Sequence, residues 1–216
     1  MAKQALSVSQ LLAQKKTTLD LTDEMRLAFG EPEAVGTWII WGQSGNGKTT
    51  FALQLAKALT LNGRVLYNSL EEGTSLSLMN AAERVKLSEV GNKVQFICED
   101  IPSLLERLKK RRSPRIVFID SLQYTQMTYK SYIEFKEALP NHLLIFVSHA
   151  RGKQPDERIG LKVKYDAMLK IWVEGYRAHS MGRFLGERGY VDVWSEGAER
   201  YWGGQITGGH GSVSEV

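Results

Sequence analysis

The chain has 216 residues and a formal net charge of +4, with 43% apolar and 24% charged residues. These values are typical of a soluble globular protein that builds one full hydrophobic core. They exclude a membrane-spanning helix, because no apolar run is long enough, and an internal disulfide bond, because Cys98 is the single cysteine. The first residues carry no hydrophobic signal core, so we expect a cytoplasmic protein without membrane association. The mild positive charge permits a polyanionic partner without requiring one.

Residues 1–34 are predicted to form a helical lead-in to the core. Residues 9–13 favour a turn or two of helix, and residues 19–29 favour a second helix that ends at Gly30. Two interpretations stay open: a helix packed on the edge of the core, or an arm that docks on a neighbouring subunit.

The strongest motif follows a predicted buried strand at residues 37–41. It matches the pattern of a phosphate-binding loop, in which glycines let several backbone N–H groups point at one anion. The pattern Phe51, Leu55, Leu59 then marks one face of a helix, whose N-terminus adds a positive dipole end. The predicted nucleotide-binding residues are Gly42, Gln43, Ser44, Gly45, Asn46, Gly47, Lys48, Thr49 and Thr50. Lys48 would reach the β- and γ-phosphates of ATP, and the Thr49 hydroxyl would bind Mg²⁺.

From the loop onward, predicted strands and helices alternate. Strands are expected at residues 64–70, 94–98, 115–120 and 142–148, and helices at residues 74–87, 101–111 and 130–139. This alternation predicts an α/β fold with a mostly parallel sheet covered by helices on both faces.

The pattern changes after His149. Residues 150–164 are charged and contain glycine, so we expect a loop. Short connections between predicted strands at residues 168–173, 182–185 and 190–194 favour antiparallel strands added to the sheet edge. We expect the core to span residues 35–202 and the Gly-rich segment 203–216 to be a mobile tail.

Two carboxylates are predicted at the tips of core strands. Asp120 ends the apolar run at residues 116–119 and would bind Mg²⁺ or one of its water ligands. Glu71, which follows the strand after the phosphate-loop helix, would deprotonate the attacking water. A surface acid at a helix start is the alternative for Glu71, and Glu72 is the fallback for its role.

These motifs together resemble the RecA-like ATPases, in the branch that includes RecA, RadA, KaiC and the DnaB-type helicase motors. The resemblance covers residues 35–195. This branch has its catalytic glutamate after the strand that follows the phosphate-loop helix, which is where Glu71 lies, so Glu71 restricts the resemblance to this branch. It implies an ATPase that works as a ring or filament, with ATP bound between subunits. It also implies that His149 occupies the place of a γ-phosphate sensor, where the family usually has glutamine. Arg177 and Arg183 are the candidates for a basic finger donated to the neighbouring subunit.

In this family the loop after the sensor commonly contacts DNA. Here that segment carries five basic residues suited to a phosphate backbone, with a solvated charged loop as the alternative: Arg151, Lys153, Arg158, Lys162 and Lys164. Tyr124 and Tyr129, in a second candidate segment, could stack on bases or pack internally.

Several functions remain open from the sequence. The first is an ATP-driven motor, recombinase-like or a minimal helicase core, that acts on single-stranded DNA. The second is a nucleotide-gated assembly or signalling ATPase of the KaiC kind, without DNA. A module that binds nucleotide without hydrolysis is disfavoured, because Lys48, Thr49, Asp120 and Glu71 occur together.

Overall fold

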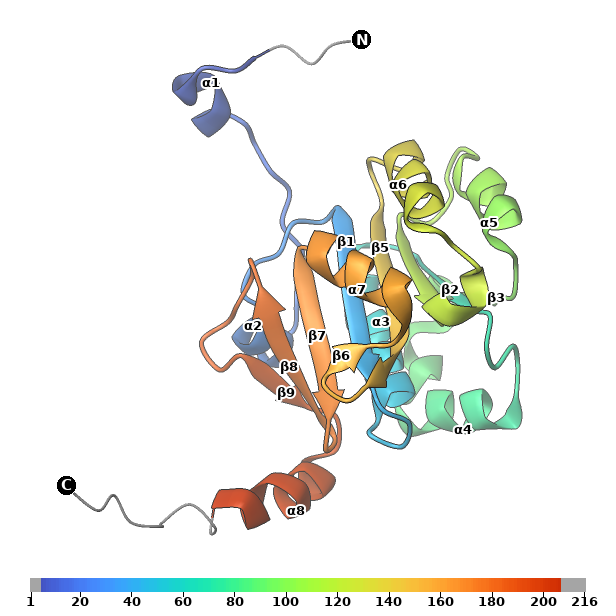
Figure 1. Cartoon of the computed structure of the whole chain (residues 1–216), viewed down its shortest axis with the longest axis vertical. Coiled ribbons are helices and arrows are strands. Elements are labelled where there is room, and N and C mark those ends of the chain that lie inside the picture. Colours follow the sequence, from blue (N-terminus) through green and yellow to red (C-terminus); the bar gives the residue numbers. More distant parts are fainter. Residues whose placement is uncertain (1–4, 207–216) are drawn as a thin grey trace, which may run out of the picture.

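The computed structural model describes residues 5–206 of the chain. A mixed β-sheet forms the centre of this part of the protein (Figure 1). Its strands are β1 (Gly36–Gly42), β2 (Val65–Ser69), β3 (Val94–Ile97), β4 (Ile116–Asp120), β5 (Leu143–Arg151), β6 (Gln154–Pro155), β7 (Leu169–Glu174), β8 (Arg177–Gly182) and β9 (Tyr190–Asp192). They lie in the order β3-β2-β4-β5-β1-β7-β8-β9, and β6 pairs with β5. The strands from β3 to β7 in this order are parallel, whereas β8 and β9 are antiparallel. This arrangement confirms the predicted fold class.

Helices cover both faces of the sheet. The α-helices are α1 (Val8–Leu12), α2 (Asp23–Phe29), α3 (Lys48–Leu59), α4 (Leu76–Arg84), α5 (Ile101–Leu108), α6 (Tyr129–Ala138), α7 (Glu157–Asp166) and α8 (Ser195–Ile206). Short 3-10 helices occupy Thr60–Asn62, Leu87–Lys93 and Leu122–Thr125. Helices α2, α3 and α4 pack on one face, and α5, α6 and α7 pack on the other. Alternate residues of β1 therefore enter different clusters: Trp38 and Ile40 face α3, while Ile39 and Trp41 face α7.

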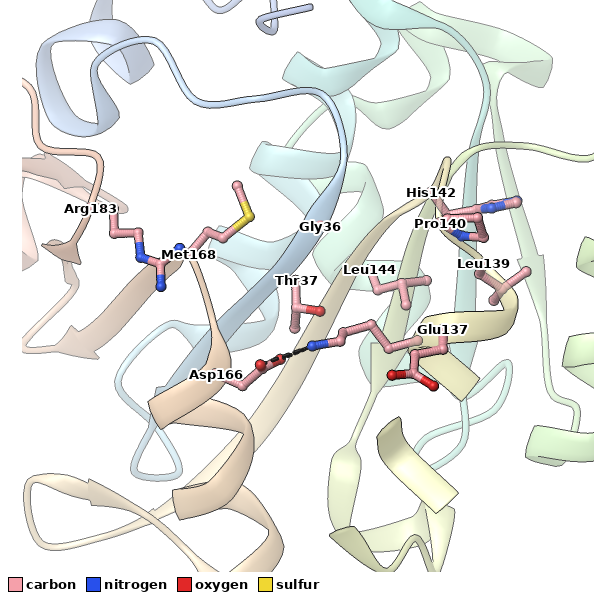
Figure 2. Close-up of a pocket in the computed structure, with 11 residues that line it drawn as sticks. Gly36, Thr37, Glu137, Leu139, Pro140, His142, Leu144, Asp166, Met168 and Arg183 are labelled. Carbon is pink, nitrogen blue, oxygen red and sulfur yellow. Dashed lines mark hydrogen bonds and ion pairs between the residues drawn. The ribbon is translucent and has the colours of Figure 1, made fainter. Parts of the chain in front are cut away.

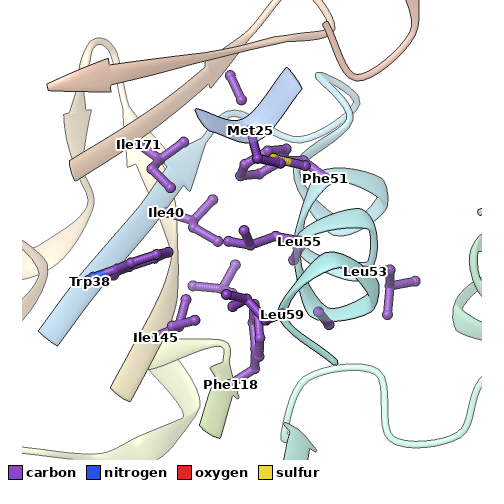
Figure 3. Packing of buried hydrophobic residues seen from close by; sticks show 14 of the residues in the cluster. Met25, Trp38, Ile40, Phe51, Leu53, Leu55, Leu59, Phe118, Ile145 and Ile171 are labelled. Carbon is purple, nitrogen blue, oxygen red and sulfur yellow. The ribbon is translucent and has the colours of Figure 1, made fainter. Parts of the chain in front are cut away.

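Helix α3 is held against the centre of the sheet (Figure 3). Its residues Phe51, Leu55 and Leu59 are fully buried, as their spacing predicts, and Ile40 and Ile145 belong to the same cluster. Burial of each large apolar side chain contributes about 1.5–3 kcal/mol to the stability of the fold. The phosphate loop is therefore fixed at both ends, by β1 before it and by α3 after it.

The expectation of a loop over residues 150–164 is wrong. Strand β5 continues to Arg151, a short β6 follows, and helix α7 occupies most of the remainder. The side chain of Asp156 caps α7, and Ile159 and Val163 turn one face of the helix into the core. With one more large apolar residue, Leu161, and five basic ones, the segment lacks the strong periodicity that marks a helix in a sequence.

Because α7 provides a crossover, β7 enters the sheet parallel to β1, and it then forms an antiparallel hairpin with β8. Strand β7 pairs antiparallel with β8, and β8 with β9, which confirms the prediction of antiparallel strands added to the sheet edge. The strand expected at residues 182–185 lies earlier, at β8, because the turn after β7 is short and contains Gly175 and Tyr176, both with positive φ.

The two predicted helices of the lead-in behave differently. Helix α2 buries Met25, Ala28 and Phe29 against the core, which fits the interpretation of a packed helix. Helix α1 has no buried residue and lies away from the body of the protein (Figure 1). At the other end, α8 extends to Ile206, so it includes the first residues of the expected tail. Residues 207–216 of that tail lie outside the described residues.

Within residues 5–206, no helix combines the length and the apolar character needed to span a membrane.

Candidate nucleotide site

The phosphate loop connects the carboxyl end of β1 to the first turn of α3. Gly45 and Gly47 have φ values of +79° and +91°, which only glycine adopts without strain. At Gly42 a Cβ atom would lie 2.3 Å from the carbonyl oxygen of Val173, so this position has room for no side chain. The glycines of the motif therefore serve the backbone shape that an anion-binding loop requires.

The strand register brings the predicted acidic and sensor residues to the same edge. Ser69 of β2 pairs with Asp120 of β4, and Gly42 of β1 pairs with His149 of β5. Since these strands are parallel, their carboxyl ends meet where ligands bind in open α/β sheets. The structure therefore brings Glu71, Asp120 and His149 to the edge that carries the phosphate loop.

Asp120 is almost fully buried behind the loop, and the Tyr67 hydroxyl donates a hydrogen bond of 2.5 Å to its Oδ2 atom. Burial raises the pKa of Asp120, while the hydrogen bond from Tyr67 and the positive charge of Lys48 act in the opposite direction. Burial and the neighbouring Asp120 carboxylate also raise the pKa of Tyr67, so its hydroxyl remains a donor. Tyr67 thereby fixes one oxygen of Asp120.

Glu71 is hydrogen-bonded to His149, with 2.7 Å between Oε2 and Nε2. Burial raises the pKa of Glu71, but the hydrogen bond and charge of His149, together with the charge of Lys48, lower it below its usual value. The carboxylate is thus kept ionised beside the phosphate loop.

Glu72 is oriented differently. Its Oε2 atom accepts hydrogen bonds from the hydroxyls of Ser75, at 3.1 Å, and of Ser77. These two serines lie at the start of α4, so this carboxylate is engaged in local structure. Of the two acids considered for water activation, Glu71 is the one bonded to a residue of another core strand, His149 of β5.

A cavity of about 320 Å³ opens over the loop. Its lining combines the loop with acidic residues and with residues from two other elements: Gln43, Ser44, Gly45, Gly47, Lys48, Thr49, Thr50, Glu71, Glu72, Arg84 and Tyr176. The sequence motifs did not reveal Arg84, at the end of α4, or Tyr176, in the turn between β7 and β8. Neither residue belongs to a recognisable pattern, and both are far from the loop in sequence.

Thr49 and Asp120 offer a hydroxyl and a carboxylate oxygen, the ligand type that Mg²⁺ prefers. The described residues contain no cluster of three or more acidic, histidine or cysteine side chains that could hold a metal ion. A site with few protein ligands suits Mg²⁺, which usually keeps water ligands and shares the phosphates of a substrate. The residues present therefore fit a Mg²⁺ ion brought with a nucleotide.

The two candidate finger arginines lie at opposite ends of β8. Arg177 is held inside the chain, where its Nε atom donates a 2.6 Å hydrogen bond to Asp192 and its guanidinium lies 4.0 Å from the ring centre of Tyr190. Arg183 lines a cavity of about 680 Å³ at the amino ends of β1, β5 and β7, on the edge opposite the phosphate loop (Figure 2). In the same cavity the ammonium of Lys136 pairs with Asp166 at 2.8 Å. Neither arginine lies at the phosphate loop of its own chain.

The five basic residues of the expected DNA loop are divided between two surfaces. The ammonium groups of Lys153 and Lys164 lie over the rings of Trp172 and Trp41, at 5.6 and 4.6 Å from the ring centres. Arg151 forms an ion pair with Asp156 at 3.2 Å.

The other two, Arg158 and Lys162, share one face of α7. Together with Tyr129 at the start of α6 they line an open cavity of about 540 Å³. The Lys162 ammonium lies 5.5 Å from the ring centre of Tyr129, and Tyr129 is 46% exposed. These residues bring two cations and an aromatic ring to one open surface, which Glu157 also lines.

The strand order, the phosphate loop after β1 and the acids after β2 and at the end of β4 define the RecA-like P-loop ATPase fold. Solved structures show the same architecture. The flagellar accessory protein FlaH from Methanocaldococcus jannaschii superimposes with a TM-score of 0.58 at 14% identity, over 83% of this chain and 92% of that one. A KaiC-like protein, PH0186 from Pyrococcus horikoshii OT3, gives a TM-score of 0.56 at 16% identity, over 82% and 98% of the two chains. At such identities the likeness establishes the fold alone.

No protein-family model matches the sequence, and no curated protein matches it significantly.

Proposed function

We propose that this protein binds ATP with Mg²⁺ at the phosphate loop and hydrolyses it. The observation that carries the proposal is the cavity in which Lys48, Thr49 and Glu71 meet, with Glu71 hydrogen-bonded to His149. A phosphate-binding loop alone would support binding, and an oriented, ionised carboxylate opposite the loop supports hydrolysis as well.

Each residue has a role in this proposal. The backbone N–H groups of the loop and the Lys48 ammonium hold the phosphates, and Glu71 orients the attacking water and accepts its proton at the carboxylate. Thr49 and Asp120 hold the Mg²⁺ ion, which when bound neutralises charge on the phosphates. His149 fixes the position of Glu71 and reports on the γ-phosphate through that contact.

The test is a measurement of phosphate release from Mg·ATP together with ATP binding. We expect Lys48→Ala to reduce turnover at least about 100-fold, because a charge at the transferred phosphoryl group is lost. Lys57→Ala is the matched control, because Lys57 lies on the same helix but pairs with Glu89 at 2.7 Å. Absence of turnover in the wild type, or ATP binding that is unchanged in Lys48→Ala, would refute the proposal.

We further propose that hydrolysis is coupled to single-stranded DNA through the surface of Arg158, Lys162 and Tyr129. The support is a pair of cations on one face of α7 beside an exposed aromatic ring. Cations contact the phosphate backbone and aromatic rings stack on unpaired bases. Strand β5 connects this surface to the nucleotide site, because the backbone N–H of Asp156 donates to the carbonyl of His149 at 2.8 Å.

DNA binding and DNA-stimulated phosphate release at low and high salt test this coupling. Replacement of both Arg158 and Lys162 by alanine should remove the stimulation and reduce the salt dependence of binding. The control with the same change of charge replaces Lys109 and Lys110, which follow α5. Wild-type turnover that does not respond to DNA would contradict the coupling and leave the ATPase proposal intact.

A second candidate function is a nucleotide-gated assembly, and helix α1 favours it. The apolar side chains of this helix are exposed: Val8 by 73%, Leu11 by 58% and Leu12 by 79%. An apolar helix away from the body of the protein suits the subunit-docking arm considered from the sequence. Light scattering with and without ATP, on the wild type and on a variant with Leu11 and Leu12 replaced by serine, tests this function. ATP-dependent growth in size that needs both leucines, and is indifferent to DNA, would favour the assembly switch over the DNA motor.

A further inference from the structure

The cavity of about 680 Å³ that Arg183 lines lies at the edge of the sheet opposite the phosphate loop (Figure 2). It is larger than the cavity of about 320 Å³ over the loop, and the two share no lining residue. Its walls come from the amino ends of β1 and β5, the carboxyl ends of α6 and α7, and the residues next to β7 and β8. A ligand in this cavity would therefore not compete with a nucleotide on the loop.

One part of the wall is apolar. Leu139 and Leu144 are buried, and Pro140 and Met168 complete this part of the lining. Gly36 leaves room for the methionine, because a Cβ atom there would lie 2.5 Å from the Sδ atom of Met168. A methionine side chain is flexible and adapts to the shape of what packs against it. A cavity of this size, with apolar walls and a few polar groups, is typical of sites that bind small organic molecules.

Three polar atoms at this cavity have no hydrogen-bond partner among the described residues: the hydroxyl of Thr37 and both ring nitrogens of His142. Thr37 is only 2% exposed. Burial lowers the pKa of His142 and the positive charge of Arg115 lowers it further, so the imidazole is neutral and can donate from one nitrogen and accept at the other. Buried polar groups are nearly always paired, so these side chains have capacity that a ligand of the cavity could satisfy.

The charges in the lining leave Arg183 free. The Tyr132 hydroxyl and the Lys136 ammonium both donate to Asp166, and the ammonium lies 2.9 and 2.8 Å from its two oxygens. The Asp166 carboxylate is thus compensated within the chain. Glu137, the other acid of the lining, is exposed on α6. Arg183 has no ion-pair partner among the described residues, so it is the uncompensated cation of the cavity.

These groups follow one another along the cavity. Figure 2 shows Arg183 beside Met168 at one end, Thr37 in the middle, and Pro140 and His142 at the other end. The backbone N–H of Arg183 donates to the carbonyl of Met168 at 3.2 Å, which fixes the first end. A ligand would meet a cation at one end, apolar side chains along its length and a neutral imidazole at the other end. This order suits an elongated molecule that carries its negative charge at one end.

We propose that this cavity binds an elongated organic carboxylate, with the carboxylate on Arg183 and the apolar body between Met168 and Leu139. The guanidinium group presents paired N–H donors that match the two oxygens of a carboxylate. The apolar body gains affinity from each methylene that it buries. This site goes beyond the proposed function and does not depend on it. Because Arg183 is also a candidate finger, a bound carboxylate would keep it from a neighbouring subunit.

The probe is octanoate, and its binding is measured by titration calorimetry in the absence of nucleotide. Octanoate should bind about tenfold more tightly than hexanoate, because it buries two more methylenes. Arg183→Gln should weaken octanoate binding about tenfold and change the binding of octanamide, which has the same body without the charge, much less. Arg188→Gln is the matched control, because Arg188 lies in the same connection between β8 and β9 and does not line the cavity.

A second variant tests the other end of the cavity. Pro140 is exposed, so Pro140→Asp should fold normally, which the Tm verifies. Its carboxylate should weaken octanoate more than hexanoate, because the longer chain extends further from Arg183. No binding of octanoate at millimolar concentration would overturn the proposal. Equal losses in Arg183→Gln and Arg188→Gln would overturn the assignment of the charged end, and equal affinities for octanoate and hexanoate would overturn the apolar body. An equal effect of Pro140→Asp on both probes would overturn the direction of the ligand.

Discussion

Glu71 and His149 come from different strand tips, yet their side chains meet at 2.7 Å beside the phosphate loop. The contact orients a carboxylate that would otherwise be free to rotate at the end of β2. It also joins the residue that would activate water to the strand that leads toward α7.

Glu71→Gln should reduce phosphate release about 100-fold or more while ATP binding is retained, because the amide cannot accept the proton of water. The matched variant is Glu72→Gln, because the wild-type Glu72 carboxylate accepts hydrogen bonds from Ser75 and Ser77 and not from a residue of a core strand. Single-turnover phosphate release and equilibrium ATP binding on both variants give the comparison. An equal loss in the two variants would remove the special role of Glu71.

Replacement of His149 should shift the acid limb of the pH–rate profile. The Glu71 pKa is lowered by its hydrogen bond to His149 and by the charge of that residue, so His149→Ala should raise it. Since the base must be ionised, turnover in the variant should then decline at a higher pH than in the wild type. The kcat/KM for ATP measured across pH, with His179→Ala as the control on β8, checks this shift. An unchanged acid limb would show that the contact with His149 does not alter the pKa of Glu71.

His142, in the turn before β5, should make the fold sensitive to acid. Burial lowers the pKa of His142, the positive charge of Arg115 lowers it further, and both ring nitrogens lack a hydrogen-bond partner among the described residues. A folded-state pKa below the unfolded value, about 6.5, means that its contribution is present above that pH and is lost as the pH falls through the folded pKa. Thermal melting of His142→Asn between neutral and acidic pH should therefore show a smaller loss of Tm than in the wild type. An equal loss in both proteins would contradict this prediction.

Arg183 is the better candidate for a finger donated in trans. Arg177 is engaged with Asp192 and Tyr190, so Arg177→Ala should lower the Tm as well as the activity. Arg183 has no ion-pair partner among the described residues, so Arg183→Ala should reduce turnover by orders of magnitude with little change in Tm.

A mixing experiment decides whether Arg183 acts between subunits. Arg183→Ala subunits keep Glu71, and Glu71→Gln subunits keep Arg183, so a mixed assembly would contain interfaces with both groups. Recovery of phosphate release on mixing is expected. No recovery, with assembly verified by size, would exclude donation of Arg183 in trans.

Much of the fold and part of the site could be predicted from the sequence because their signals are local. The phosphate loop needs consecutive residues to shape one turn, and Asp120 follows its strand directly, so neighbours in sequence carry the information. The buried runs of the central strands and the spacing of Phe51, Leu55 and Leu59 likewise reflect continuous burial.

The misplaced elements had weaker signals. Helix α7 shows only two large apolar residues on its buried face, and its five basic neighbours favoured a loop. Once this helix was missed, the parallel entry of β7 could not be foreseen, because the crossover that α7 supplies sets the direction of the strand.

The sequence by itself determined that a phosphate-binding loop lies between a buried strand and a helix, and that acidic residues follow neighbouring strands, since each feature depends on adjacent residues. Only the tertiary structure decided that Glu71 meets His149, that Arg177 is engaged with Asp192, and that Thr37, His142 and Arg183 line one cavity. These contacts join segments that are far apart in the chain, and the side-chain packing that brings them together leaves no repeating pattern in the order of the residues.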